Sequence, residues 1–277
     1  MLQFREMHES PKPKRIHVSI RGGNPVEFAT LDSPRLDRNI RSIYDVISEK
    51  LNASAIEAHV SMLPEAGTYS KRMTDNLPES LEEAKIEEKI LGASEYPDDL
   101  RLNTRSAEYI SWEDKFKLMC STLLKRDNNV QEVHLTVDTW SLGTAFFVKF
   151  LSEQSNRQFL IDNRIHIKGI HFIAPTVASG TSFAIDELSE DLKAGLREFL
   201  NESKHNIYVT GNKSDQILEG KGQEFAEEIA RILDVNAEIE DHSQNDRLTS
   251  HYVADSDVIN RAVMTSIEMV RQADSQL

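Results

Sequence analysis

Residues 132–151, EVHLTVDTWSLGTAFFVKFL, decide how the fold of this chain is interpreted. The first part of the stretch alternates β-branched and other apolar residues with polar ones, which is typical of a β-strand. Its middle, residues 139–143, is centred on a serine, and apolar residues then recur at helical spacing. The stretch therefore predicts a strand, a tight turn and a helix in immediate succession.

Ser141, at the centre of the predicted turn, is a candidate nucleophile. A tight strand-to-helix turn forces its serine into a strained backbone conformation and lifts the hydroxyl clear of the sheet edge. The next amide, that of Leu142, would lie at a helix N-terminus, where it can stabilise an oxyanion. The motif differs from G-x-S-x-G at its first glycine, which is Thr139 here. We expect Ser141 to be nucleophilic despite this difference.

Composition limits the classes of protein that fit. With 277 residues the chain can bury the core of one large α/β domain, and a formal net charge of −14 disfavours general nucleic-acid binding. The single cysteine, Cys120, cannot form an internal disulfide and is expected to be a buried helical thiol. No apolar run approaches the ~20 residues of a membrane span, and no secretory signal is visible. A cytoplasmic protein is favoured; the oligomeric state is not predicted.

Strand and helix patterns alternate along the chain, which predicts a mainly parallel, doubly wound α/β sheet flanked by helices. Residues 1–14 are expected to form a flexible arm and residues 15–277 a single domain. Besides the opening stretch, strands are predicted at 15–20, 55–63, 164–174, 206–210 and 237–240, and helices at 33–51, 106–125, 222–233 and 255–271.

Two segments depart from the simple alternation. Residues 74–103 are rich in glutamate and aspartate, and we interpret them as a solvated acidic helix in an insertion rather than a site for a cationic partner. Residues 176–203 open with small residues and continue with a helical pattern. They form either a lid over the ligand end of the sheet or an ordinary crossover helix.

A serine nucleophile needs a base and a carboxylate that orients the base. Asp215 lies in the turn directly after the strand predicted at 206–210, where it can reach the C-terminal edge of the sheet. His251 precedes the terminal helix, and His242 follows the strand predicted at 237–240. We favour Asp215 as the acid and His251 as the base, with His242 as the alternative base.

A second oxyanion donor is expected from the loop after the first strand, RGGN. Two glycines there allow the backbone to approach a ligand closely, which favours the amide of Gly23, with Asn24 as the alternative. The remaining histidines are expected to be structural or solvated, and they are His8, His17, His59, His134, His166, His171 and His205.

Residues 15–271 resemble a serine-type α/β-hydrolase in the order of their elements and in their motifs. The resemblance implies an active site at the C-terminal ends of the strands, with a triad of Ser141, Asp215 and either His251 or His242. The usual N-terminal strand hairpin has no counterpart in the leading arm. Certain fungal lipases are similar to this chain in carrying Thr-Trp-Ser-x-Gly.

The resemblance implies hydrolysis of a small-molecule ester or thioester through an acyl-enzyme on Ser141. Neither His-x-x-x-His nor Cys-x-x-Cys spacing nor a phosphate-binding glycine loop is present, so no cofactor or metal is expected. Two alternatives remain open. The same residues would serve an acyltransferase, and a non-catalytic hydrolase-fold module could bind a ligand or a protein partner instead.

Overall fold

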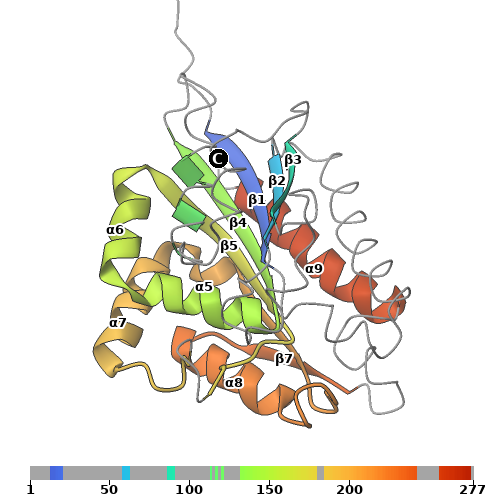
Figure 1. Cartoon of the computed structure of the whole chain (residues 1–277). Helices are drawn as coiled ribbons and strands as arrows, with labels where there is room; N and C mark the ends of the chain where they lie inside the picture. The colour runs from blue at the N-terminus through green and yellow to red at the C-terminus, as the bar shows by residue number, and fades with distance from the viewer. Residues whose placement is uncertain are drawn as a thin grey trace, which may run out of the picture.

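A mixed sheet organises the part of the chain that the structure describes (Figure 1). Seven strands lie in the order β3-β2-β1-β4-β5-β6-β7, and every neighbouring pair is parallel except β2 with β3. The computed structural model describes residues 13–20, 58–62, 86–90, 113, 116–117, 120–121, 132–179, 184–241 and 256–275, to which all structural statements refer. The mainly parallel α/β class predicted from the sequence is confirmed.

The elements follow the predicted alternation closely in the second half of the chain. The strands are β1 (Lys14–Ile20), β2 (Ala58–Met62), β3 (Ile86–Ile90), β4 (Val133–Trp140), β5 (Ile165–Ile173), β6 (Ile207–Asn212) and β7 (Ala237–Glu240). The helices are α5 (Leu142–Ser152), α6 (Gln154–Asp162), α7 (Glu190–Phe199), α8 (Gly222–Leu233) and α9 (Ser256–Ser275), with a short 3-10 helix, η2 (Asn201–Asn206).

The sheet has a topological switch point between β1 and β4. From β1 the chain passes to β2 on one side, whereas β4 pairs with β1 on the other side. In open α/β sheets, ligands bind beyond the carboxyl ends of the strands at such a point. Because β4 ends at Trp140, Ser141 lies at the edge of the sheet where this rule places a ligand.

The two faces of the sheet differ in chemistry. Side chains alternate between the faces along a strand, so Leu135 and Val137 of β4 lie on one face while Thr136 and Asp138 lie on the other. On the first face α5 and α8 bury a large apolar core, whose largest side chains include Phe146, Phe147 and Phe150. On the second face, α9 covers a buried polar layer (Figure 1).

Two histidines organise the polar layer beneath α9. His17 of β1 hydrogen-bonds Thr136 Oγ1 and Asp138 Oδ2 of β4, each at 3.0 Å. His171 of β5 bonds Thr210 Oγ1 at 2.9 Å and Ser266 Oγ of α9 at 3.0 Å. Both imidazoles are fully buried, where an unpaired ring nitrogen would be costly. They are structural, as their strand patterns predict.

The acidic-helix prediction for residues 74–103 is wrong at residues 86–90, which form β3. This strand pairs antiparallel with β2, and Ile86 and Ile90 lie opposite Met62 and Ala58. Ile86 and Ile90 are four positions apart, and residues at this spacing lie on one face both in a helix and in a strand. The sequence pattern alone therefore does not distinguish a helix from a strand here. Hydrogen bonding with β2 shows that residues 86–90 form a strand.

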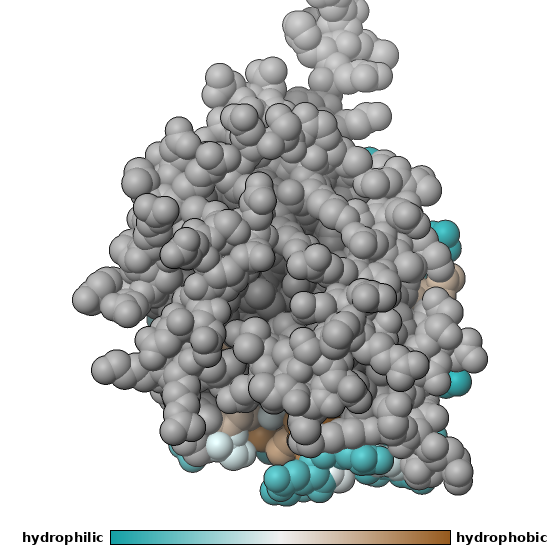
Figure 2. All heavy atoms as spheres, turned by 45° about the vertical axis from the view of Figure 1, so that its right-hand side comes forward, coloured by the Kyte–Doolittle hydropathy of each residue, from teal (hydrophilic) through white to brown (hydrophobic). Residues whose placement is uncertain are grey.

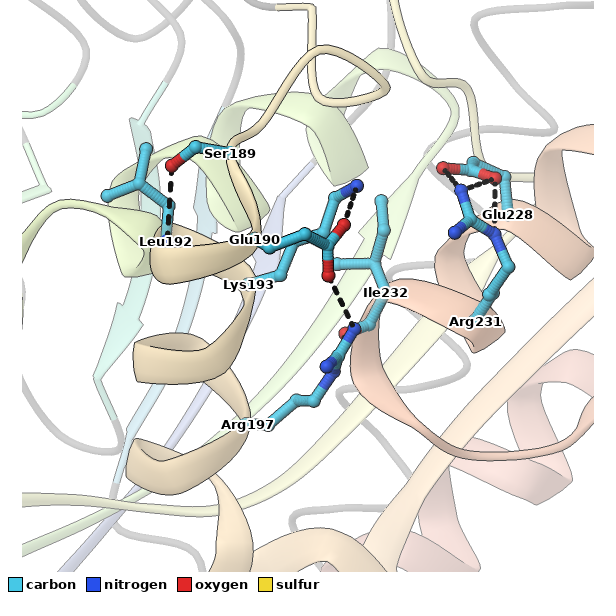
Figure 3. A network of polar contacts seen from close by, with 8 residues as sticks. All are labelled: Ser189, Glu190, Leu192, Lys193, Arg197, Glu228, Arg231 and Ile232. Carbon is cyan, nitrogen blue, oxygen red and sulfur yellow. Dashed lines mark hydrogen bonds and ion pairs between the residues drawn. The ribbon is translucent and has the colours of Figure 1, made fainter.

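Helix α7, within the segment considered as a lid, is packed as the crossover between β5 and β6. It contacts α5 and α8, and its Lys193 and Leu196 are buried. Figure 3 shows polar contacts of α7 beside α8, where Arg197 Nε donates to the carbonyl of Ile232 of α8 at 2.8 Å. The helix begins with an N-cap bond from Leu192 N–H to Ser189 Oγ. Lid motion of residues 176–203 stays a prediction.

The expectation of a buried, helical thiol at Cys120 is confirmed. On the side shown in Figure 2, the described surface is mostly hydrophilic along the lower edge, beside a small hydrophobic area. No helix in the described ranges has the length and apolar character needed to span a bilayer. Cys120 is buried and helical, and desolvation raises the pKa of its thiol far above the usual value.

Candidate active site

Ser141 has the backbone conformation that a strand-to-helix elbow demands. Its φ is 48° and its ψ is −119°, so a residue with a Cβ occupies a region that only glycine visits readily. Three hydrogen bonds hold it there. Its N–H donates to the carbonyl of Ile173 at 3.0 Å, and its own carbonyl accepts from Thr144 and Thr176 at 3.1 and 3.4 Å. The surroundings therefore impose the strain.

The Ser141 hydroxyl does not form a capping hydrogen bond with the helix that follows it. Serine at an N-cap normally accepts a hydrogen bond from an amide of the first helical turn, but Ser141 makes no side-chain cap bond to α5. Leu142 is the first residue of α5, and the first four amides of a helix have no acceptor inside it. The turn thus presents a hydroxyl and, directly after it, a helix N-terminal amide.

Thr139, which replaces the first glycine of the motif, is accommodated by a specific contact. Its Oγ1 lies 2.9 Å from Oγ1 of Thr144 on α5, and both residues are fully buried. The strand and the helix are therefore joined by a hydrogen bond at the position where the motif usually has glycine.

The loop after β5 lies against the Ser141 turn, and its part from Thr176 onward belongs to the segment that the sequence singled out as a possible lid. Ala174 has φ 43°, and its N–H donates to the carbonyl of Thr210 at the end of β6. Thr176 N–H donates to the Ser141 carbonyl, and beyond it Val177 is buried with its carbonyl accepting from Ile185. The backbone of Thr176 is therefore tied directly to the turn that carries the serine.

Asp215, the predicted acid, is fully buried in the turn after β6. Its Oδ1 accepts from the amides of Ile217 and Leu218 at 3.0 Å each, and its carbonyl accepts from Gly220 N–H at 2.7 Å. These bonds fix the orientation of the carboxylate. A methyl group at Gly222 would lie 2.8 Å from the Asp215 Cβ, so glycine is required there.

The Asp215 turn is tied to the end of β7 by Asp241. Ser214 Oγ donates to Asp241 Oδ1 at 2.8 Å, and Lys213 Nζ lies 2.6 Å from Asp241 Oδ2. The Lys213 N–H also donates to the carbonyl of Glu240 at 3.1 Å. Sequence reasoning missed Asp241, although an acidic residue immediately after a strand predicted at 237–240 was a usable signal.

The structure places Ser141 and Asp215 at the same edge of the sheet, after β4 and β6, with β5 between these strands. Gly23, His242 and His251 lie outside the described residues, so the second oxyanion donor and the base stay predictions. No cluster of three or more metal-ligating side chains suited to an ion occurs within the described part of the chain.

A groove of about 670 Å³ lies away from this edge. It is lined by η2, the first residues of β6 and β7, and residues 234–236. Because the groove borders the amino ends of these strands, it is separate from Ser141 and Asp215, which follow carboxyl ends. It does not contribute to the candidate active site.

The strand order and the strand–turn–helix at Ser141 belong to a mainly parallel α/β fold. No protein-family model and no curated protein sequence matches the chain.

Solved structures match the fold with low similarity. An uncharacterized protein from Bacillus cereus ATCC 10987 is 11% identical, with a TM-score of 0.43, over 97% of this chain and 63% of the other. A proposed carboxylesterase from Lactobacillus plantarum WCFS1 is 10% identical, with a TM-score of 0.39, over 86% and 78%. An S-formylglutathione hydrolase from Agrobacterium tumefaciens is 13% identical, with a TM-score of 0.38, over 92% and 84%. The chain thus spans less than two thirds of the Bacillus protein.

Proposed function

We propose that the protein is a serine hydrolase that cleaves a carboxylic ester or thioester through an acyl-enzyme on Ser141. The observation that carries the proposal is the positive φ of a serine at the carboxyl end of β4. A non-glycine residue in such a region costs about 1–3 kcal/mol, and such strain clusters at functional sites. Its hydroxyl is moreover not used to cap α5.

In the proposed reaction, Ser141 Oγ attacks the acyl carbonyl and its proton passes to the imidazole of His251, or of His242 in the alternative. The imidazole then protonates the leaving alcohol or thiol. Water attacks the acyl-enzyme with the same imidazole as base, which releases the acid and restores the Ser141 hydroxyl. Asp215 orients the imidazole throughout.

The negative charge of each tetrahedral intermediate needs two preorganised donors. We assign these to the amides of Leu142 and Gly23. Support for Leu142 comes from its place as the first residue of α5, where the amide has no acceptor within the helix and the helix dipole favours an anion. Removing one such donor typically costs about 10²–10³-fold in kcat, on the order of 3 kcal/mol.

Support for Asp215 comes from its burial and from the turn that holds it. A carboxylate whose orientation is set by two backbone amides can hold a histidine in one tautomer. The chain order of serine, aspartate and histidine is the one that this kind of sheet uses.

A fluorophosphonate probe tests the proposal, because it labels an activated serine covalently. We expect stoichiometric labelling of the wild-type protein at Ser141 and none in Ser141→Ala. Ser275→Ala, at the exposed end of α9, is the control and should label as the wild type does. A folded, monodisperse wild type that takes up no probe would contradict the proposal and favour a non-catalytic binding protein.

The substrate class is tested by hydrolysis of p-nitrophenyl esters and the matching thioesters over a series of acyl chain lengths. We expect the highest kcat/KM with short acyl chains, because the segment after β5 carries Asp186 and Glu187 rather than a run of large apolar residues. A product ester that accumulates when a primary alcohol is added would instead identify an acyltransferase.

A further inference from the structure

The turn that follows β5 contains a second strained residue beside Ser141. Ala174 comes directly after β5 and has φ 43°, a left-handed conformation that residues with a Cβ rarely adopt. It also precedes Pro175, and a proline favours extended backbone in the residue before it. Ala174 and Pro175 are both buried. Strained conformations of this kind persist only where the surrounding structure determines them, and they cluster at functional sites.

Hydrogen bonds on both sides of Ala174 connect this turn to Ser141. The N–H of Ser141 donates to the carbonyl of Ile173 at 3.0 Å, and the carbonyl of Ser141 accepts from the N–H of Thr176 at 3.4 Å. Only Ala174 and Pro175 separate Ile173 from Thr176 in the sequence. The backbone of these two residues therefore sets the distance between the acceptor and the donor that bind Ser141.

The Ala174–Pro175 turn is itself fixed by the neighbouring strand. The N–H of Ala174 donates to the carbonyl of Thr210, in β6, at 2.8 Å. The ring of Pro175 holds its own φ at about −65°. A hydrogen bond, a proline ring and burial thus leave the turn little freedom to move the groups that contact Ser141.

Strand β6 also leads to the predicted acid. It ends at Asn212, whose carbonyl accepts from the N–H of Asp215 at 3.2 Å. In the sheet, β5 lies between β4 and β6. The Ala174–Pro175 turn therefore connects the elbow after β4 to β6, and so to the turn that carries Asp215, through main-chain hydrogen bonds.

We propose that Ala174 is a positioning residue for the nucleophile, because the turn that it forms with Pro175 holds Ser141 at its positive φ. The same turn fixes the serine relative to Asp215. This inference rests on the proposed serine-hydrolase function. A catalytic group displaced by about 1 Å can lose roughly 10²-fold in rate, so a turn that keeps Ser141 in one conformation contributes to kcat. Ala174 is fully buried and acts through Ser141 rather than by touching substrate.

The test compares Ala174→Gly with Arg164→Gly. Glycine adopts many backbone conformations, so the first variant leaves the turn free to move away from the one that binds Ser141. Arg164 is a matched control because it has φ 54° and directly precedes β5, at the opposite end of the strand that Ala174 follows. We expect Ala174→Gly to lower kcat and the rate of fluorophosphonate labelling about tenfold, with KM and the final extent of labelling unchanged. Arg164→Gly should match the wild type in each measurement.

Hydrogen exchange measures the turn itself, without any substrate. The exchange rates of the Ser141 and Thr176 amides, followed by NMR, should rise about tenfold in Ala174→Gly. The amide of Val133, which donates to the carbonyl of Arg164, should keep its wild-type rate. An equal rise at all three amides would show that the substitution destabilises the whole fold rather than the Ser141 turn, and would overturn the inference.

A second variant keeps the test independent of the Ala174 methyl group. Pro175→Ala retains Ala174 but removes the ring that fixes residue 175 and restricts residue 174, so it should also lower the labelling rate. Wild-type labelling rates and amide exchange in both variants, or equal losses in Ala174→Gly and Arg164→Gly, would overturn the inference. Failure of the wild type to label at Ser141 would instead reject the proposed function, whereas amide exchange would still test how Ser141 is held.

Discussion

The hydroxyls of Thr139 and Thr144 lie 2.9 Å apart and join the end of β4 to the first turn of α5 across the Ser141 turn. A strand and a helix that meet at an elbow must approach closely, and glycine usually permits this. Here two buried threonines meet the same requirement by pairing their hydroxyls. Thr139, which replaces the glycine of the motif, is therefore accommodated by its hydrogen bond with Thr144.

The hydrogen bond between Thr139 and Thr144 predicts how substitutions at Thr139 change the free energy of unfolding. Thr139→Val keeps the shape of the side chain but leaves the buried Thr144 hydroxyl without its partner, which should lower the free energy of unfolding by about 1–3 kcal/mol. Thr139→Ser keeps the hydroxyl and should lose less. Urea denaturation of both variants measures the difference. Equal stability of the two variants would show that the hydrogen bond is unimportant.

Replacement of Ser141 separates strain from catalysis. Ser141→Gly removes the hydroxyl and relieves the positive φ, whereas Ser141→Ala removes the hydroxyl and keeps the strain. We expect both variants to be inactive and Ser141→Gly to be more stable than Ser141→Ala by about 1 kcal/mol. Thermal and urea unfolding test this order. A glycine variant that is less stable than the alanine variant would argue against backbone strain at this position.

Buried His171 predicts a pH dependence of stability. Desolvation, its largest cause, lowers the pKa of this imidazole to about 4, while Asp138 acts in the opposite direction and His17 in the same one. Because the pKa is lower in the folded than in the unfolded protein, the contribution of His171 is fully present above about pH 6.5 and is lost as pH falls toward 4.

Unfolding free energies measured from about pH 7.5 to about pH 4.5 test the contribution of His171. The wild type should lose stability over this range more steeply than His171→Gln, which carries no titratable ring. His205→Gln, outside the buried layer, serves as the control and should keep the wild-type slope. Parallel curves for the wild type and His171→Gln would contradict the prediction.

The glycines after β6 should respond differently to alanine. At Gly222 an added Cβ would lie 2.1 Å from the Asn212 carbonyl oxygen and would press on Asp215, so we expect Gly222→Ala to lower both stability and kcat. Gly220 has φ 79° with open space around it, so Gly220→Ala should cost about 1 kcal/mol through backbone strain alone. Its kcat should stay near the wild-type value. Steady-state kinetics with urea unfolding distinguish the two effects.

Local sequence patterns predicted much of the second half of the fold. Helix α8 and strand β7 have the bounds that periodicity indicates, residues 222–233 and 237–240. The pattern of β-branched residues before Ser141 and of apolar residues after it likewise predicted β4 and α5. These elements are set by neighbours along the chain, so a short window of sequence contains the information needed to recognise them.

Strand β3 shows where this reasoning fails. The pattern of its residues is compatible with a helix as well as with a strand. The pairing with β2 shows that the strand forms. For the candidate site, the sequence predicted Ser141 and Asp215 because each follows a strand. The contacts of Asp241 with Lys213 and Ser214 were not predicted, because the partners lie in another element and a single sequence does not reveal such pairs.

By itself, then, the sequence determined the strand–turn–helix at Ser141, the place of Asp215 after a strand and the mainly parallel class of the sheet. Only the tertiary structure decided the positive φ of Ser141, the polar layer of His17 and His171, and the ion pair between Glu240 and Arg261. The physical reason is the separation along the sequence over which each effect acts. Periodicity and turn chemistry act between near neighbours, whereas strain, burial and ion pairing are imposed by residues that are distant in sequence and meet only in the folded chain.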